Sequence, residues 1–213
     1  MKTTAICSRV AHERSARLML RRWNRRGRPQ RRLLWSLLFS LSLPAITTAQ
    51  QGHPTELQVK AAYLYNFGKF VRWPADRDPS PKSREICVLG KDPFGAVLDA
   101  TVAGESMDGR PITVRRLANL PDAPSCSILF VSTSEENRLY TILSAARGLG
   151  VLTVSDIPHF AERGGTIGFV VQQGRIRFEV NRDAAEQSHI GLSSELLKVA
   201  TRVIGTDPPR GQP

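Results

Sequence analysis

Several residue patterns that support catalysis are missing from this sequence. It has only three cysteines and four histidines. No Cys-x-x-Cys motif is present, which argues against thioredoxin-like redox chemistry, and no His-x-x-x-His pair could form a helical zinc site. No serine lies in the Gly-x-Ser-x-Gly frame of a nucleophile elbow, and Gly164 and Gly165 precede a strand-like segment rather than the helix of a phosphate loop. The sequence therefore predicts no catalytic residues, no metal and no cofactor.

Most of the chain also has little net positive charge, although the formal net charge of the whole sequence is +11. Residues 1–49 hold eleven of the 30 lysines and arginines and only one acid, Glu13. Residues 50–213 are left with nineteen bases and eighteen acids. A nucleic-acid-binding protein needs its positive charge on the folded surface. The sequence therefore argues against a nucleic-acid partner.

The N-terminus has the three parts of a secretory signal peptide. Its basic stretch leads into an apolar run at 33–43, and small residues precede a cleavage site before Gln50. As a helix this run would span about 16 Å, roughly half the hydrocarbon thickness of a bilayer, so a cleaved signal is favoured over an uncleaved anchor. We therefore expect residues 1–49 to be a signal peptide, residues 50–55 a short linker, and the mature protein to be periplasmic.

Residues 55–72 predict the first helix of the mature chain, because they contain no proline and repeat apolar residues at helical spacing. Besides its apolar stripe, this segment carries aromatic side chains all around it: Tyr63, Tyr65, Phe67, Phe70 and Trp73. A helix with this pattern is either deeply buried or covers a partner. Tyr65 and Trp73 are expected nearest to solvent.

The rest of the chain alternates between helix and strand signals, with no internal repeat. Apolar runs predict strands at 86–90, 111–117, 127–131 and 151–154, with a helix starting at Asp92–Pro93 and another ending near Gly148. Residues 166–180 predict an antiparallel hairpin that turns at Gln173 and Gly174, followed by a short helix capped by Asn181, an amphipathic helix at 192–204 and a tail at 206–213. This order predicts a single three-layer α/β domain over 56–205, with a mixed sheet of five or six strands flanked by helices, and a C-terminal hairpin and helix.

Two cysteines, Cys87 and Cys126, remain after signal cleavage. Each adjoins a predicted central strand, so if those strands are neighbours their Cα atoms can lie within disulfide distance. An oxidising compartment favours such a bond. The other interpretation is a pair of inert buried thiols.

Three polar residues after the strand at 151–154 are the best candidates for a chemical site. Asp156, His159 and Glu162 could share one helical turn as metal ligands or surround a pocket, but a solvated turn explains them better. Glu179, on the second hairpin strand, is either a buried partner of a nearby arginine or an ordinary exposed position.

The aromatic helix resembles the opening signature of the YfiR (DUF4154) family of exported bacterial proteins. The resemblance continues in order through the segments 86–94, 150–156, 164–169, 176–181 and 191–197. It covers residues 56–205, which is nearly all of the mature domain.

The resemblance implies a non-catalytic periplasmic α/β protein that is often dimeric. It also implies a function: binding the periplasmic part of a membrane diguanylate cyclase of the YfiN type and repressing it, which lowers cyclic-di-GMP and biofilm formation. A sensor kinase is another possible partner, since family members also occur beside such kinases. The characterised repressor has two disulfides, and this chain retains only the first cysteine pair, so redox switching through the second is in doubt.

Two hypotheses follow for the function. The favoured one is a regulatory binding protein whose partner surface includes the five aromatics and Glu179. The alternative is a small-molecule-binding module or unrecognised hydrolase that uses Asp156, His159 and Glu162.

Overall fold

The computed structural model describes residues 54–73, 82–120 and 125–205. Its main feature is a sheet with the strand order β10-β8-β7-β6-β5-β2-β4-β3. The predicted signal peptide (1–49) and tail (206–213) lie outside the described residues, as does most of the predicted linker (50–55). The boundaries of those segments stay predictions.

The sheet is mixed. Its centre is parallel and consists of β4 (Arg110–Leu117), β2 (Arg84–Leu89), β5 (Cys126–Val131), β6 (Leu152–Ser155) and β7 (Ile167–Gln172). At one end β8 (Arg175–Asn181) runs antiparallel to β7, and β10 (Arg202–Ile204) runs parallel to β8. At the other end β3 (Ser106–Met107) pairs antiparallel with β4. A separate two-stranded sheet joins β1 (Val71–Arg72) to β9 (Gly191–Leu192).

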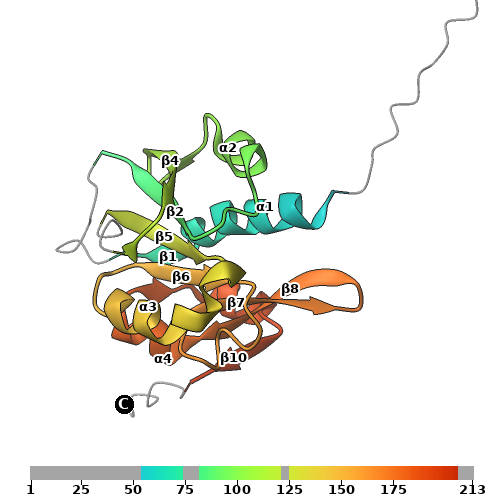
Figure 1. The fold of residues 1–213 in the computed structure, drawn as a ribbon, viewed down its shortest axis with the longest axis vertical. Helices are drawn as coiled ribbons and strands as arrows, with labels where there is room; N and C mark the ends of the chain where they lie inside the picture. The colour runs from blue at the N-terminus through green and yellow to red at the C-terminus, as the bar shows by residue number, and fades with distance from the viewer. Residues whose placement is uncertain (1–53, 74–81, 121–124, 206–213) are drawn as a thin grey trace, which may run out of the picture. The chain divides into compact units, whose positions relative to one another are not determined.

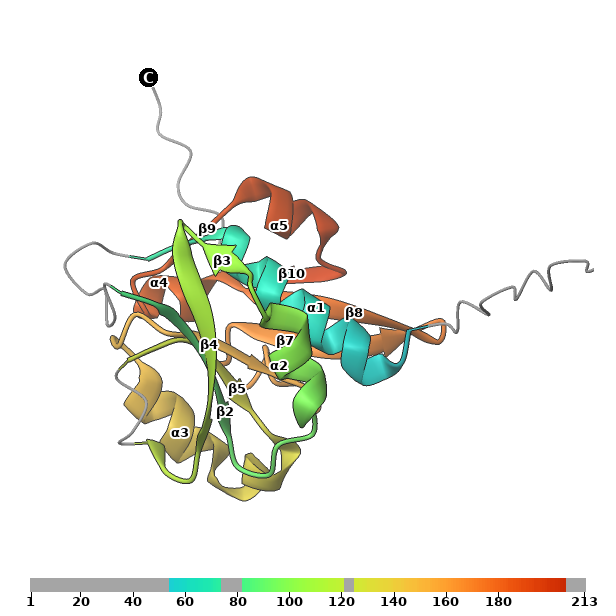
Figure 2. The same cartoon turned by 90° about the horizontal axis from the view of Figure 1, so that it is seen from above.

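Helices cover both faces of the sheet, giving three layers (Figure 2). On one face α1 (Glu56–Lys69) and α2 (Ala96–Val102) pack on the larger apolar core, with residues such as Ile86, Ile128 and Phe130 beneath them. On the other face η3 (Thr133–Arg138) leads into α3 (Leu139–Ala146), which covers Leu129 and Val131. The remaining helices, α4 (Arg182–Gln187) and α5 (Ser194–Val199), follow the hairpin. The predicted three-layer α/β domain is confirmed.

The hairpin has the predicted register and turn. Ile167, Phe169 and Val171 lie opposite Val180, Phe178 and Ile176. Gln173 and Gly174 both have positive φ, 52° and 70°, which suits a two-residue turn of the type that follows the twist of the strands. Asn181 caps α4, because its side chain accepts a hydrogen bond from the Ala184 amide.

Two predictions about the extent of the sheet and of the last helix were wrong. The main sheet has eight strands rather than five or six. The predicted helix at 192–204 is helical only over α5, because the Thr201 amide and hydroxyl both donate to the Phe178 carbonyl and align the following residues as β10. Short edge strands such as β3 and β10 carry too few residues to show a period of two.

Two helix boundaries also differ from the predicted ones. The first helix ends at Lys69, where Phe70 leaves helical geometry and the next residues pair with β9 as β1. The second starts at Ala96 rather than Pro93. Asp92 instead accepts a hydrogen bond from the Phe94 amide at 2.7 Å, which makes a local turn ahead of the helix.

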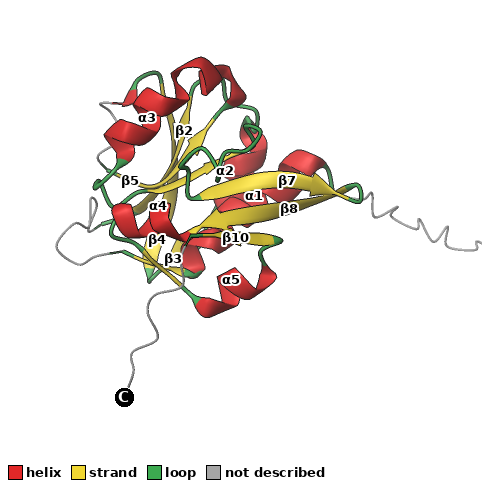
Figure 3. Cartoon of the chain, turned by 90° about the horizontal axis from the view of Figure 1, so that it is seen from below, coloured by secondary structure: helices red, strands yellow, loops and turns green. Residues whose placement is uncertain are grey.

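The hairpin extends beyond its neighbours in the sheet (Figures 1 and 3). Strand β6 pairs with β7 only at Ile167 and Gly168, and β10 pairs with β8 only from Glu179 onward. The distal half of the hairpin is therefore a two-stranded ribbon. One face of this ribbon packs on α1, where Phe169 contacts Tyr63 and Phe178 contacts Phe67.

Candidate functional site

The two cysteines form a disulfide across neighbouring strands. Cys87 on β2 and Cys126 on β5 are both fully buried, and their Cα atoms are 5.8 Å apart. Beside the bond, the Arg115 guanidinium lies 3.8 Å from the Cys126 sulfur and contacts the Glu85 carboxylate at 3.2 Å. This pair of charges gives one end of the disulfide a polar environment.

The middle of the aromatic helix belongs to the core. Phe67 is 1% exposed and lies edge-on to Phe178, with ring centroids 4.9 Å apart. Tyr63 is half-buried and stacks on Phe67 at 5.6 Å, and it also contacts Phe169. The projecting hairpin therefore buries much of the aromatic surface of α1, which the sequence could assign either to the core or to a partner.

The aromatics at the C-terminal end of the helix are more accessible. Phe70 is 38% exposed. Tyr65 is half-buried, and its hydroxyl donates to Glu105. Trp73 packs on the Arg84 guanidinium at 4.6 Å, and its indole nitrogen donates to the Ser127 carbonyl at 3.3 Å. Of the five aromatics, Phe70 has the largest exposed fraction.

An open groove of about 830 Å³ runs beside the hairpin. It brings together candidate site residues that lie in separate segments of the sequence. Asp156, His159 and Glu162 line it from the β6–β7 loop, and Glu179 lines it from β8. Its apolar wall is formed by Phe169, Val170, Val171 and Ile176.

Lys60 also lines this groove and is 6% exposed. Its ammonium group contacts the Asp156 carboxylate at 2.8 Å and the Glu56 carboxylate at 2.6 Å. Burial by itself would lower the pKa of Lys60, but its hydrogen bonds to Asp156 and Glu56 outweigh burial and raise the pKa above its ordinary value of 10.5. Lys60 is therefore charged at neutral pH, and it ties α1 to the β6–β7 loop.

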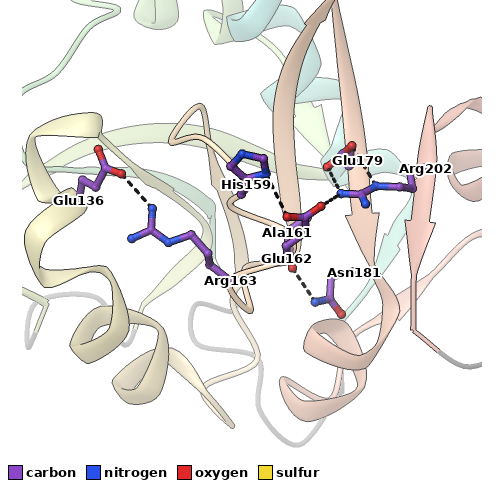
Figure 4. A network of polar contacts seen from close by, with 8 residues as sticks. All are labelled: Glu136, His159, Ala161, Glu162, Arg163, Glu179, Asn181 and Arg202. Atoms are coloured by element: carbon purple, nitrogen blue, oxygen red, sulfur yellow. Dashed lines mark hydrogen bonds and ion pairs between the residues drawn. The ribbon is translucent and has the colours of Figure 1, made fainter.

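A second set of charges connects that loop to the end of the sheet (Figure 4). Arg202 on β10 donates to both carboxylate oxygens of Glu179 at 3.0 Å and also to Glu162. The ring of His159 contacts the other oxygen of Glu162 at 3.0 Å. From the same loop, Arg163 contacts Glu136 at 2.9 Å. Glu179 is therefore neither deeply buried nor free, since β10 supplies its partner.

The three candidate ligands do not converge on one point. Asp156 is directed toward Lys60, whereas His159 and Glu162 contact each other. In the described part of the chain, the one group of donors close enough to share a metal ion is Glu85 with Cys87 and Cys126. The sulfurs of that group are already joined to each other.

Lys60 and Arg202 are the two cations that organise the groove, and the sequence did not predict a role for either. A signal for Lys60 was present in the i, i+4 spacing of Glu56 and Lys60. Nothing local marked Arg202, because its partners lie 23 and 40 residues away along the chain.

The titration of Glu162 should report whether this network forms in solution. Hydrogen bonds from Arg202 hold the pKa of the Glu162 carboxyl below its ordinary value of 4.5. Because the pKa is lower in the folded state, this contact stabilises the protein at pH values above the pKa of Glu162 in the unfolded state. That stabilisation is lost as the pH falls through the pKa of Glu162 in the folded state. We expect an NMR titration of Glu162 to show a midpoint below 4.5 that rises in Arg202→Gln. Arg177→Gln is the matched control, and equal midpoints in all three proteins would contradict the network.

The fold and the site describe a single α/β domain with a buried disulfide and a groove of paired charges. The chain belongs to the YfiR/HmsC-like family, because the family model DUF4154 matches residues 57–201. Membership suggests a periplasmic regulator of cyclic-di-GMP signalling, and proteins of this family are typically regulatory rather than catalytic.

The chain is weakly similar to several solved structures, including the two described next, and no curated protein matches it. An ABC domain in complex with L-Trp from Streptococcus pneumonia is 14% identical, with a TM-score of 0.45, over 68% of this chain and 62% of that one. A conserved domain protein from Vibrio cholerae is 15% identical, with a TM-score of 0.43, over 60% of this chain and 57% of that one. The chain thus spans less than two thirds of either, and this similarity is too low to indicate a shared function.

Within the described ranges, none of the helices has the length and apolar character needed to cross a bilayer.

Proposed function

We propose that this protein is a non-catalytic periplasmic repressor that binds the periplasmic domain of a membrane signalling protein. Its first candidate partner is a diguanylate cyclase of the YfiN type, whose repression lowers cyclic-di-GMP, and a sensor kinase is the second. The observation that carries the proposal is the family match over residues 57–201. By analogy with the family, we propose that the protein acts as a homodimer.

The accessible end of α1 supports a binding role. Tyr65 lies on α1 and Phe70 is its C-cap residue, and Phe70 keeps more than a third of its surface in solvent. Aromatic side chains contribute strongly to protein interfaces, because they bury a large area at a low entropic cost. Trp73 is a poorer probe of binding, since its replacement would also remove contacts to Arg84 and Ser127.

Deleting the gene should raise cyclic-di-GMP and surface attachment. We expect the wild-type chain to restore repression and the Tyr65→Ala/Phe70→Ala variant to restore it poorly, with cyclic-di-GMP measured by mass spectrometry. Tyr140→Ala is the matched control, because Tyr140 is an aromatic residue with 80% exposure on α3. An unchanged cyclic-di-GMP level after deletion would rule out the cyclase as partner and favour the sensor kinase.

A second candidate function is a small-molecule-binding module or hydrolase. The observation in its favour is the groove of about 830 Å³ that contains Asp156, His159 and Glu162. A polar metabolite that raises the melting temperature of the wild-type protein, but not of His159→Ala, would favour this function over direct repression.

A further inference from the structure

The strongest unexplained feature of the molecule is a second groove along the hairpin, which shares Glu56, Val171 and Ile176 with the larger one. It has a volume of about 590 Å³ and lies between the start of α1 and the outer edge of β8. Val59 and Tyr63 line it from α1, and Val171 and Ile176 line it from the hairpin. Val171 is 67% exposed, a large value for a valine in a strand whose inner half belongs to the core.

The edge of β8 that borders this groove has backbone groups available for pairing. The Phe178 carbonyl accepts from the Thr201 amide on the outer edge of β8. Because successive residues of a strand direct their backbone groups to alternate edges, the N–H and C=O of Ile176 lie on the same outer edge. Strand β10 pairs only with Glu179 and beyond, so Ile176 has no strand partner there among the described residues.

Two arginines give this edge a positive charge. Arg175 and Arg177 line the groove and are exposed. Neither has an ion-pair partner in the part of the chain that the structure describes, whereas Arg202, on the neighbouring strand, is held by two carboxylates. An unpaired edge strand with basic side chains is protected from pairing with a like-charged strand but attracts an acidic one.

Side chains along a strand alternate between the two faces of the sheet, and this alternation determines which residues a strand added to the edge of β8 would need. Ile176 faces α1, while Arg175 and Arg177 face the opposite side. A strand added to this edge would place every second side chain over Val59 and Tyr63, and the others beside the arginines. Apolar and acidic residues would therefore have to alternate along it.

We propose that the outer edge of β8 and the adjoining groove bind an extended segment of a partner protein in which apolar and acidic residues alternate. The partner adds a strand to the hairpin, its backbone pairs with Ile176, and its carboxylates pair with Arg175 and Arg177. This inference rests on the proposed function, which is that the chain binds a partner protein. It adds the binding site and the chemistry of the partner segment.

Selection from a displayed library of short random peptides against the mature protein tests the proposal without the cyclase. The selected peptides should alternate apolar residues with Asp or Glu, and in NMR spectra they should shift and protect the Ile176 amide. Affinity should fall by about tenfold or more in Arg175→Glu/Arg177→Glu, because like charges then face each other across the strands. Alternate N-methylation of a selected peptide should abolish its binding, since it removes the backbone donors.

Lys91→Glu/Arg147→Glu is the matched control, because both side chains are exposed and lie outside the groove. Selected peptides that lack the alternation, or that bind the Arg175→Glu/Arg177→Glu variant as tightly as wild type, would overturn the proposal. Vesicles containing phosphatidylglycerol that bind through the same arginines in place of peptides would overturn it in favour of a membrane surface. Self-association that depends on these arginines, measured by sedimentation without peptide binding, would overturn it in favour of a second copy.

Discussion

Replacing both cysteines with alanine should lower the free energy of unfolding by about 4 kcal/mol. The disulfide closes a loop with a sequence separation of 39 residues, and in the chain-entropy model a loop of this length accounts for about 4 kcal/mol. Both sulfurs are fully buried between β2 and β5, so the bond also connects two central strands of the sheet. Urea unfolding of the mature oxidised protein and of Cys87→Ala/Cys126→Ala measures the difference.

Reductant provides the control for this comparison. It should lower the stability of the wild-type protein toward that of the variant and leave the variant unchanged. Thiol titration of the denatured, unreduced protein should find no free thiol. If two free thiols were found, the cysteines would be inert buried residues and the expected loss would not occur.

Asp156→Asn should destabilise the protein by about 3 kcal/mol. Removing one partner of a buried ion pair costs about 3 to 5 kcal/mol, because the remaining charge is left without its counter-ion. The lower end applies here, because the Asp156 side chain is 21% exposed and Lys60 keeps its contact with Glu56. The pKa of Lys60 is raised, so its charge contributes to stability at neutral pH, and that contribution is lost only as the pH rises through a folded pKa above 10.5.

Two further variants separate the ion pair from a general effect of removing an acid. Glu186→Gln changes an exposed carboxylate and should alter stability by less than about 0.5 kcal/mol. Lys60→Met/Asp156→Asn removes both charges and should be more stable than Asp156→Asn alone, because no unpaired ammonium is left buried. Equal urea midpoints for Asp156→Asn and Glu186→Gln would show that Lys60 does not depend on Asp156.

The ion pairs that span the larger groove also affect which ligands could bind there. Lys60 and Arg202 each bridge two carboxylates, and together they hold the β6–β7 loop against α1 and β10. A ligand that entered the large groove would have to compete with these contacts. Along the outer edge of β8, by contrast, Arg175 and Arg177 have no such contacts to break among the described residues. The second groove is therefore the better place for an acidic partner.

The amino-acid sequence by itself determined the elements with strong local signals. Thr55, the N-cap of α1, forms a capping box with Gln58. Strand β5 contains the apolar run 128–131, which fits a strand buried on both faces. Alternation along 167–172 and 175–181 defined the hairpin and its register, because a shift by one residue would expose Phe169 and Phe178. Membership of the family was likewise apparent from these same segments, and the family match supports it.

Only the tertiary structure decided how those elements use their side chains. Whether the helix aromatics were core or interface could not be read from helical spacing, because the hairpin that buries Phe67 lies about a hundred residues further along the chain. The edge strands β3 and β10 form through pairing with a longer neighbour, which no local pattern records. Asp156, the second partner of Lys60, is likewise distant in sequence, and so are the partners of Arg202. Long-range pairing depends on the position of the whole backbone, so the groove, its charges and the free edge of β8 follow from the fold and not from any single segment.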